Sequence, residues 1–470
     1  MHLPDMIEAK KRTRVNEANI YDYVFTKIDE SLVGKKYFVR TYGCQMNEHD
    51  GERIKGVLES EGLIETDNIE EASIVILNTC AVRENAHDKV FGYLGLVKKL
   101  KETKNILLGI CGCMPQEKSV CDLIMSKYKY VDFMFGTHNL DQMINVINES
   151  IKNKKQEIEV YSMPGNICEG IPEKKDSNIT AWVDIQLGCD KFCTYCIIPY
   201  TRGMQRSRRH EDIINEVKAL KEKGYKEVTL LGQNVNAYGK DLYDDYNLAN
   251  LLRDVDKTGI DRIRFITSHP WDFTDEMIDA IASCPHVMPY IHLPMQAGSN
   301  KILKLMNRSY TKEEYLSLYN KIRERVTNAT ITTDIIVGFP GETEEDFEET
   351  LEMVDKCKFD GAYTFIYSPR ENTPAALLKD DTPKEVKEER LHRLNEKVNK
   401  YSNESNQRLL GKTVKCLVTN ISEKDTSKYA GYSEGMKLVN IESNENIIGQ
   451  IVDVEITEAK SFSLDGKVVK

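Results

Sequence analysis

Three cysteines stand close together in the stretch LGCDKFCTYCIIPYTRG, residues 187–203: Cys189, Cys193 and Cys196, with the spacing Cys-x3-Cys-x2-Cys. Cysteine thiolates bind zinc and iron–sulfur clusters, and both kinds of site usually have four protein ligands. The motif offers no fourth cysteine or histidine, since the next histidine is His210. Three thiolates leave one iron of a four-iron cluster free for an outside ligand. The spacing therefore favours a [4Fe-4S] cluster over structural zinc.

Cysteines also end three consecutive apolar runs nearer the start of the chain: KKYFVRTYGC, ASIVILNTC and NILLGICGC. Each run predicts a strand, and a helical pattern follows it, so the strands should form a parallel sheet. Ligands bind beyond the carboxyl ends of such strands. We therefore expect Cys44, Cys80 and a cysteine of the third run to lie along one edge. Cys111 competes with Cys113, because alternation sends residues two apart to the same side; we prefer Cys113, which is closer to the loop.

Composition limits the classes of protein that this chain can belong to. Its 470 residues are too many for one ordinary domain, and its net charge of -11 argues against a surface that coats nucleic acid in general. A local basic patch is still compatible with that charge. The chain contains no apolar run of about 18 residues and no secretory signal at its start. We expect a cytoplasmic protein without membrane contact, in which the 12 cysteines stay reduced.

The rest of the pattern predicts an α/β protein of several domains. A second alternating series contains WVDIQL, EVTLLGQ, RIRFITS, PYIHLPM, TITTDIIVGF and GAYTFIYS, six strands with helices between them. Six β/α units favour a partial, open-sided barrel with its site at the carboxyl ends of the strands. The strand-rich tail predicts a small β-barrel. The expected boundaries are 1–34 for an N-terminal arm, 35–152 for the first α/β domain, 153–174 for a linker, 175–405 for the partial (β/α)6 barrel and 406–470 for the β-barrel.

A Cys-x3-Cys-x2-Cys motif at the first strand end of a partial barrel resembles the radical S-adenosylmethionine superfamily. The resemblance implies that the open iron binds the amino and carboxylate groups of S-adenosylmethionine. An electron from the cluster would then cleave the sulfonium and release a 5′-deoxyadenosyl radical. The expected fourth ligand of the cluster is thus the cosubstrate itself.

The order of the three domains resembles the methylthiotransferase family over nearly the whole chain after the arm. The stretches TYGCQMNEHD, NTCAVRENAHDKVFG, GCDKFCTYCIIPYTRG and HLPMQAGSNKILKLMNRSYTKEEY are most similar to the bacterial branch that acts on N6-dimethylallyladenosine in tRNA. This implies a second, auxiliary [4Fe-4S] cluster on Cys44, Cys80 and Cys113, since the GCM motif of the family carries the third ligand. It also implies that the tail is a TRAM domain, an RNA-binding β-barrel.

The resemblance further implies a function. The adenosine 3′ of the anticodon, position 37, would gain a methylthio group at carbon 2 in a reaction that uses two molecules of S-adenosylmethionine. That carbon bears a hydrogen without useful acidity, so a radical must activate it, and cofactors supply such chemistry. The implied partners are a dimethylallylated tRNA, whose flipped-out loop base would be recognised, and an external one-electron reductant such as flavodoxin or ferredoxin. We expect a monomer.

Other residues near the predicted site are candidates for binding. Five residues fall at or near barrel strand ends and could bind S-adenosylmethionine: Gln233, Ser268, Gln296, Asp334 and Gly338. A basic run follows the cluster motif and could contact phosphate: Arg202, Arg206, Arg208 and Arg209. In the tail, Gly431-Tyr432-Ser433 replaces the Gly-Arg-Thr that relatives usually show, and three lysines could compensate: Lys428, Lys437 and Lys460. The sequence assigns no catalytic side chain.

Three alternatives stay open at this point. One sister methylthiotransferase acts on threonylcarbamoyl-adenosine of tRNA and shares every cluster ligand, and another modifies an aspartate of a ribosomal protein. A different class is a non-catalytic iron–sulfur electron carrier. That reading would need two sites with four thiolates each and would leave the six β/α units and the RNA-type tail without a use.

Overall fold

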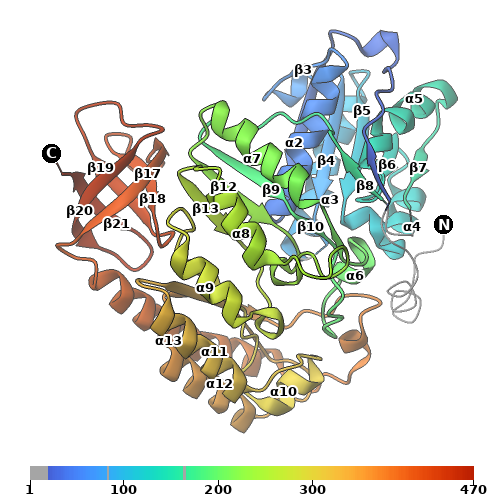
Figure 1. The fold of residues 1–470 in the computed structure, drawn as a ribbon. Helices are drawn as coiled ribbons and strands as arrows, with labels where there is room; N and C mark the ends of the chain where they lie inside the picture. The colour runs from blue at the N-terminus through green and yellow to red at the C-terminus, as the bar shows by residue number, and fades with distance from the viewer. Residues whose placement is uncertain (1–18, 82–83, 162–165, 470) are drawn as a thin grey trace.

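The structure, a computed structural model, describes residues 19–81, 84–161 and 166–469. Figure 1 shows three parts in series: an α/β domain at the upper right, a central domain of strands and helices, and a β-barrel at the left. The α/β class, the parallel N-terminal sheet and the five-stranded barrel at the end of the chain are as predicted. None of the described helices has the length and apolar character that a membrane span requires.

The N-terminal domain is a six-stranded parallel sheet with helices on both faces. Its strands lie in the order β3 (Ile64–Glu65), β2 (Lys36–Thr41), β4 (Ile74–Thr79), β5 (Leu107–Gly112), β6 (Phe133–Phe135), β7 (Glu157–Glu159). All six residues of β4 are buried, as expected for a strand covered on both faces. One core lies under α2 (Gln45–Ser60) and α5 (Met143–Asn153), and the other lies under α3 (Glu84–Lys101) and α4 (Lys118–Lys127).

Three short strands lie in segments that the sequence assigns to the linker and the arm. Strand β7 adds an edge to the sheet from within residues 153–174. In the same segment β8 (Ile167–Glu169) pairs in parallel with β1 (Ile20–Asp22) of the arm. These strands lie in mostly polar segments without a longer apolar run, which is why the sequence did not predict them. Residues 1–18 of the arm lie outside the described part of the chain.

The central domain contains the six strands that the sequence predicts. Three form the sheet β13 (Arg262–Phe265), β12 (Glu227–Leu231), β9 (Thr180–Asp184), and three form the sheet β14 (Tyr290–His292), β15 (Thr330–Val337), β16 (Gly361–Ile366). A parallel bridge between Ile263 and Val287 joins the two sheets. Strands β9 and β16 are therefore the two edges of a partial barrel.

Helices cover the outer face of this barrel. They are α7 (His210–Glu222), α8 (Leu248–Asp256), α9 (Asp275–Ser283), α10 (Asn300–Leu305), α11 (Lys312–Arg325), α12 (Glu344–Cys357) and α13 (Lys384–Gln407). Near the first strand end lie the short elements β10 (Gln186–Leu187), α6 (Ile198–Thr201) and β11 (Arg206–Ser207). Apolar residues of alternate strand positions and of these helices form one continuous core. Helix α13 runs along the lower edge in Figure 1 and leads to the final domain.

The last domain is a closed barrel in the order β17 (Thr413–Ile421), β18 (Tyr429–Ser433), β19 (Leu438–Glu442), β21 (Leu464–Val468), β20 (Ile451–Ala459). The alternation predicted for β20 is present, with Val454 and Ile456 buried and Asp453 and Glu455 outside the core. Two buried arginines join this barrel to the central domain. Arg262 donates to the backbone oxygens of Tyr432 and Lys415, at 2.8 and 2.9 Å, and Arg264 donates to those of Glu434 and Ser433, both at 2.9 Å.

Candidate active site

The first cysteine set along the chain, Cys44, Cys80 and Cys113, lies at the carboxyl ends of three neighbouring strands, β2, β4 and β5. Cys44 is the N-cap of α2, Cys80 follows β4, and Cys113 precedes a 3-10 turn, Met114–Gln116. The side chain of Cys111 instead belongs to the core under α2 and α5. The two cysteines diverge because the strand ends at Gly112, whose φ is +93° and whose Cβ, if present, would lie 2.4 Å from the Thr79 oxygen. The alternation rule stops applying at such a residue.

The thiols of this set differ in their electrostatic surroundings. A hydrogen bond with the Cys80 side chain lowers the pKa of Cys44 to about 6, and the Arg202 guanidinium adds to this effect while burial opposes it. Burial raises the pKa of Cys113, and Arg202 opposes that rise. Burial alone accounts for most of the rise in the pKa of Cys111, which lies well above its ordinary value. Since a thiolate is the form that binds metal, Cys44 is more ready to do so than Cys113.

The second cysteine set, Cys189, Cys193 and Cys196, lies in the loop between β10 and α6. Gly188 opens the loop with a φ of +79°, and a Cβ there would lie 2.0 Å from the Met204 oxygen. The Cys189 amide donates to the Gly203 oxygen at 3.1 Å, and the Cys196 amide donates to the Cys193 oxygen at 2.9 Å. Burial raises the pKa of Cys196 to about 12. These contacts fix the backbone of the three cysteines on one short turn.

Each set has one buried arginine that donates a hydrogen bond to a cysteine sulfur. Arg308 donates from Nη1 to Cys193 Sγ at 3.4 Å, and Arg202 donates from Nε to Cys113 Sγ at 3.2 Å. Donors of this kind suit thiolate ligands, and hydrogen bonds to sulfur are common at iron–sulfur clusters. Across the described residues, no three His, Cys, Asp or Glu side chains converge on one metal-ion position. A cubane cluster does not need them to, because its cysteines bind different irons.

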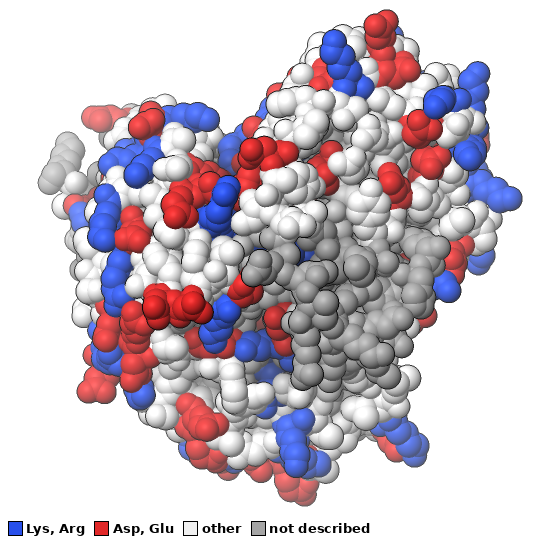
Figure 2. All heavy atoms as spheres, turned by 45° about the vertical axis from the view of Figure 1, so that its right-hand side comes forward, with Lys and Arg blue, Asp and Glu red and all other residues white. Residues whose placement is uncertain are grey.

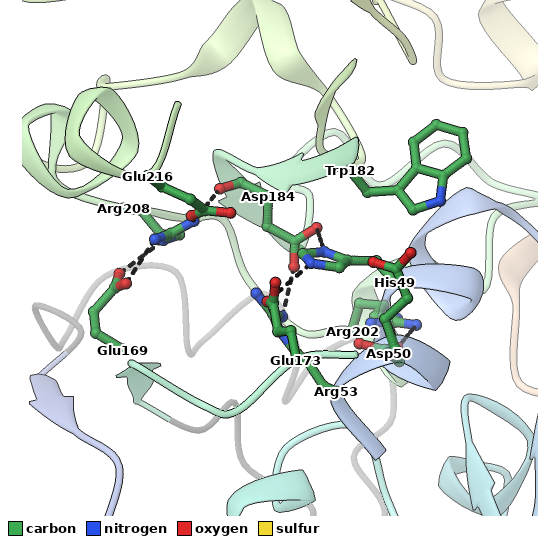
Figure 3. Close-up of polar contacts among 12 residues, drawn as sticks. His49, Asp50, Arg53, Glu169, Glu173, Trp182, Asp184, Arg202, Arg208 and Glu216 are labelled. Atoms are coloured by element: carbon green, nitrogen blue, oxygen red, sulfur yellow. Dashed lines mark hydrogen bonds and ion pairs between the residues drawn. The ribbon is translucent and has the colours of Figure 1, made fainter. Parts of the chain in front are cut away.

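The two sets face each other across the boundary between the first two domains. Ile197, next to Cys196, packs against Cys113 and Ala81. One turn into α2, His49 pairs with Asp184 of β9 at 2.8 Å and with Glu173 at 3.0 Å (Figure 3). Arg53 pairs with the same two carboxylates, at 2.7 Å for Asp184 and 3.0 Å for Glu173. A buried polar network therefore holds the helix that begins at Cys44 against the strand that leads to Cys189.

The five residues predicted to bind S-adenosylmethionine fall into two groups. Three have contacts within the protein: Gln233 Oε1 accepts from the Gly188 amide, Asp334 pairs with His292 at 3.3 Å, and the Gly338 amide donates to Glu342 at 2.7 Å. The other two, Ser268 and Gln296, have buried polar oxygens without a hydrogen-bond partner in the described structure. A buried polar group without a partner is costly, so these two atoms fit a polar ligand at the strand ends.

Two further side chains near this site were not predicted. Asn234 Oδ1 and His269 Nε2 are also buried without a hydrogen-bond partner among the described residues. Burial, together with nearby Arg308, holds the pKa of His269 well below its usual value, so the ring is neutral at pH 7. Each adjoins a predicted residue at a strand end, in LLGQN and TSHP, which is the signal that could have revealed them.

The basic run after the cluster loop is mostly engaged inside the protein. Arg202 pairs with Asp50 at 2.5 Å, and Arg208 pairs with Glu169 at 2.7 Å and with Glu216 at 2.8 Å. Arg206 is buried as well, and burial beside Arg202 lowers its pKa to about 10. Arg209 alone of the four is exposed, and it pairs with Asp212 at 2.7 Å. The expectation of a phosphate-binding run is therefore wrong for Arg202 and Arg208, whose charges carboxylates already compensate.

The tail lysines and the Gly431–Ser433 segment have structural contacts of their own. Lys428 and Lys460 both pair with Asp465 at 3.0 Å, and Lys437 Nζ donates to the Asp360 backbone oxygen at 2.8 Å inside the domain interface. The backbone of Tyr432 and Ser433 accepts from Arg262 and Arg264. This segment thus joins domains. On the face shown in Figure 2, acidic and basic side chains are interspersed rather than gathered by sign.

Comparisons with known proteins agree with this arrangement. Three family models match the chain: the Uncharacterized protein family UPF0004 over residues 36–136, the Radical SAM superfamily over 183–354 and the TRAM domain over 407–469. A solved radical S-adenosylmethionine methyltransferase, TsrM from Kitasatospora setae, has a similar fold, with a TM-score of 0.56 and 13% identity over 73% of this chain and 75% of that one. The fold and the cysteine loop define a radical S-adenosylmethionine enzyme.

Curated relatives identify the family within this class. A tRNA-2-methylthio-N(6)-dimethylallyladenosine synthase from Oceanobacillus iheyensis is 53% identical, over 99% of this chain and 91% of its own length. A protein of the same name from Staphylococcus aureus is 50% identical over the same shares. The chain belongs to the tRNA-2-methylthio-N(6)-dimethylallyladenosine synthase family, which confirms the resemblance predicted from the sequence.

Proposed function

We propose that this enzyme converts N6-dimethylallyladenosine at position 37 of tRNA into 2-methylthio-N6-dimethylallyladenosine with two molecules of S-adenosylmethionine. The observation that carries the proposal is the pair of three-cysteine sets that meet at one domain boundary, in a chain that matches its relatives over 99% of its own length and 91% of theirs. Two [4Fe-4S] clusters would be held there, on Cys44, Cys80 and Cys113 and on Cys189, Cys193 and Cys196. When bound, they and S-adenosylmethionine supply the one-electron chemistry that activates the adenine carbon and the site for the transferred sulfur.

The residues of the chain would hold and orient these groups. Gln233 keeps the cluster loop in place through the Gly188 amide. Ser268 and Gln296 offer S-adenosylmethionine two buried acceptors at the barrel strand ends. Asp334 and Gly338 would shape the same end, since Asp334 lies on β15 and Gly338 directly follows it. The ring of His269 is neutral because its pKa is low, and its Nδ1 accepts from the Trp271 amide at 3.3 Å, so its Nε2–H can donate one hydrogen bond without adding charge.

The partners follow from the same proposal. The substrate is a dimethylallylated anticodon stem-loop, read as an unstacked base, and the electron donor is an external one-electron reductant such as flavodoxin or ferredoxin. The enzyme would work as a monomer in the cytoplasm, where its cysteines stay reduced. The 12 cysteines all lie among the described residues, and none of them forms a disulfide there.

The test is nucleoside mass spectrometry after an anaerobic reaction. The cluster-loaded protein receives S-adenosylmethionine, a reductant and two tRNAs, one dimethylallylated and one threonylcarbamoylated at adenosine 37. We expect the methylthio product from the first tRNA alone. Product from the second alone would assign the enzyme to the threonylcarbamoyl branch. Formation of 5′-deoxyadenosine with neither tRNA changed would contradict a tRNA substrate and leave a protein target, such as a ribosomal aspartate, to be tested.

A further inference from the structure

Arg202 belongs to the central domain but ends at the cysteine set of the N-terminal domain. It is the C-cap of α6, directly after the loop of Cys196, and its amide donates to the Ile198 oxygen at 2.8 Å. Its guanidinium crosses the domain boundary, where Nε donates to Cys113 Sγ at 3.2 Å and Nη2 to Asp50 Oδ2 at 2.5 Å. Only 4% of the residue is exposed. Figure 3 shows this pair of Arg202 and Asp50 beside α2.

The contact between Arg202 and the Cys113 sulfur is not needed to hold the two domains together. A buried pair of Arg202 and Asp50 would hold the domains together without touching a cysteine. Instead the guanidinium is shared, with one edge on the carboxylate and Nε on the sulfur. Arg308 makes the matching contact in the other set, where Nη1 donates to Cys193 Sγ at 3.4 Å while Nη2 donates to the Pro294 oxygen at 3.1 Å. Each cysteine set therefore has its own cationic donor.

We propose that Arg202 is a positioning residue of the first cysteine set, which orients Cys113 and raises the reduction potential of the iron–sulfur cluster held there. The inference rests on the proposed function, in which Cys44, Cys80 and Cys113 hold that cluster. Hydrogen bonds to sulfur and nearby charge set the potential of such clusters. The reduced cluster carries one more negative charge than the oxidised one, so a buried cation stabilises the reduced form. Arg202 follows the loop that carries Cys196. The position of that loop therefore also affects the reduction potential of the cluster on the first set.

The test uses the full-length chain with Cys189, Cys193 and Cys196 changed to Ala, so that only the first set can hold a cluster. Iron is counted after anaerobic loading, and the potential is then measured by a redox titration followed by electron paramagnetic resonance. In this background we expect Arg202→Gln to shift the potential to a more negative value. Arg202→Lys, which keeps the charge but not the Nε donor, should shift it less in the same direction. Asp50→Asn should shift it to a more positive value, because it removes the neighbouring negative charge.

The matched control is Arg308→Gln, which should leave the potential of the first set unchanged. In the mirror background, with Cys44, Cys80 and Cys113 changed to Ala, Arg308→Gln should shift the potential and Arg202→Gln should not. An unchanged potential in Arg202→Gln at full iron content would overturn the inference, as would shifts of equal sign for Arg202→Gln and Asp50→Asn. If Arg202→Gln does not retain iron, the inference is decided by the directions in which Arg202→Lys and Asp50→Asn shift the reduction potential. Failure of the parent variant to bind about four irons per chain would refute the proposed function instead, before any titration.

Discussion

At the scale of single residues, the clearest case is the choice between Cys111 and Cys113. The two lie on either side of Gly112, and their spacing does not choose between them, although the place of Cys113 beside the loop favours it. In the structure Cys111 is a core residue under α2 and α5, whereas Cys113 contacts Arg202. Both are buried, so exposure does not separate them. The difference is the neighbour of each sulfur: apolar side chains for Cys111 and a cationic donor for Cys113.

This difference predicts opposite outcomes for two similar substitutions. Cys113→Ser should lower the iron content of the anaerobically loaded protein from about eight to about four per chain, because one cluster loses a ligand. Cys111→Ser should keep the iron and cost about 1–3 kcal/mol of unfolding free energy, since it buries a hydroxyl among apolar groups. Iron analysis and urea unfolding of both variants measure this. Equal iron loss in the two variants would show that the assignment of Cys113 is wrong.

At the scale of elements, the cluster loop depends on a backbone shape that only glycine provides. Gly188→Ala places a methyl group 2.0 Å from the Met204 oxygen in a position that already has a φ of +79°. We expect the loop to shift and the cluster on Cys189, Cys193 and Cys196 to be lost, with about four irons per chain retained on the other cysteine set. Gly224→Ala is the control, because Gly224 has a φ of +93° but no atom within 4 Å of its Cβ position. It should cost only the backbone strain of roughly 1–2 kcal/mol and keep all of the iron.

Most elements could be predicted from sequence because their signal is periodic and local. The six barrel strands and the alternation in β20 were found in this way. The three-residue strands β1, β7 and β8 were not, since nothing in IYD, EIE or ICE is periodic, and their partners come from distant segments. The same reason hid the roles of Arg202 and Arg208. A basic run suggests solvent or phosphate, and only the fold brings Asp50, Glu169 and Glu216 to those arginines.

At the scale of the whole molecule, the two cysteine sets can act together only if the N-terminal and central domains are held in a fixed relative position. The network of His49, Arg53, Glu173 and Asp184 provides this, and His49 is fully buried in it. Burial disfavours the charged ring, but Asp184 and Glu173 outweigh burial and Arg53, and the pKa of His49 rises to about 9. The imidazolium is therefore the native form at pH 7.

The raised pKa of His49 predicts a pH dependence of stability. A group whose pKa is higher in the folded state adds stability that is complete below its unfolded pKa, about 6.5, and is lost as pH rises through about 9. We expect the unfolding free energy to fall by up to roughly 3 kcal/mol over this window. His49→Gln should flatten this fall, while the exposed control His392→Gln should not. Urea unfolding at pH 6 and pH 9.5 checks this, and equal slopes in all three proteins would contradict it.

The junction of the central domain with the TRAM barrel should be equally rigid. Arg264 donates to two backbone oxygens of the barrel and pairs with Glu227 at 2.8 Å, and the side chains of both residues are buried. Arg264→Met leaves those oxygens without their donor and leaves the buried Glu227 carboxylate with only the more distant Arg262, at 3.9 Å. This should cost about 3–5 kcal/mol and expose the residues before β17 to protease. Arg253→Met removes an exposed pair with Glu276 and should cost at most about 1 kcal/mol. Because the described contacts of Arg264 are with Glu227 and the barrel rather than with a cysteine set, iron content should be unchanged while tRNA binding weakens. Intact tRNA binding in an Arg264→Met protein that is cut before β17 would show that the barrel contributes nothing to holding the tRNA.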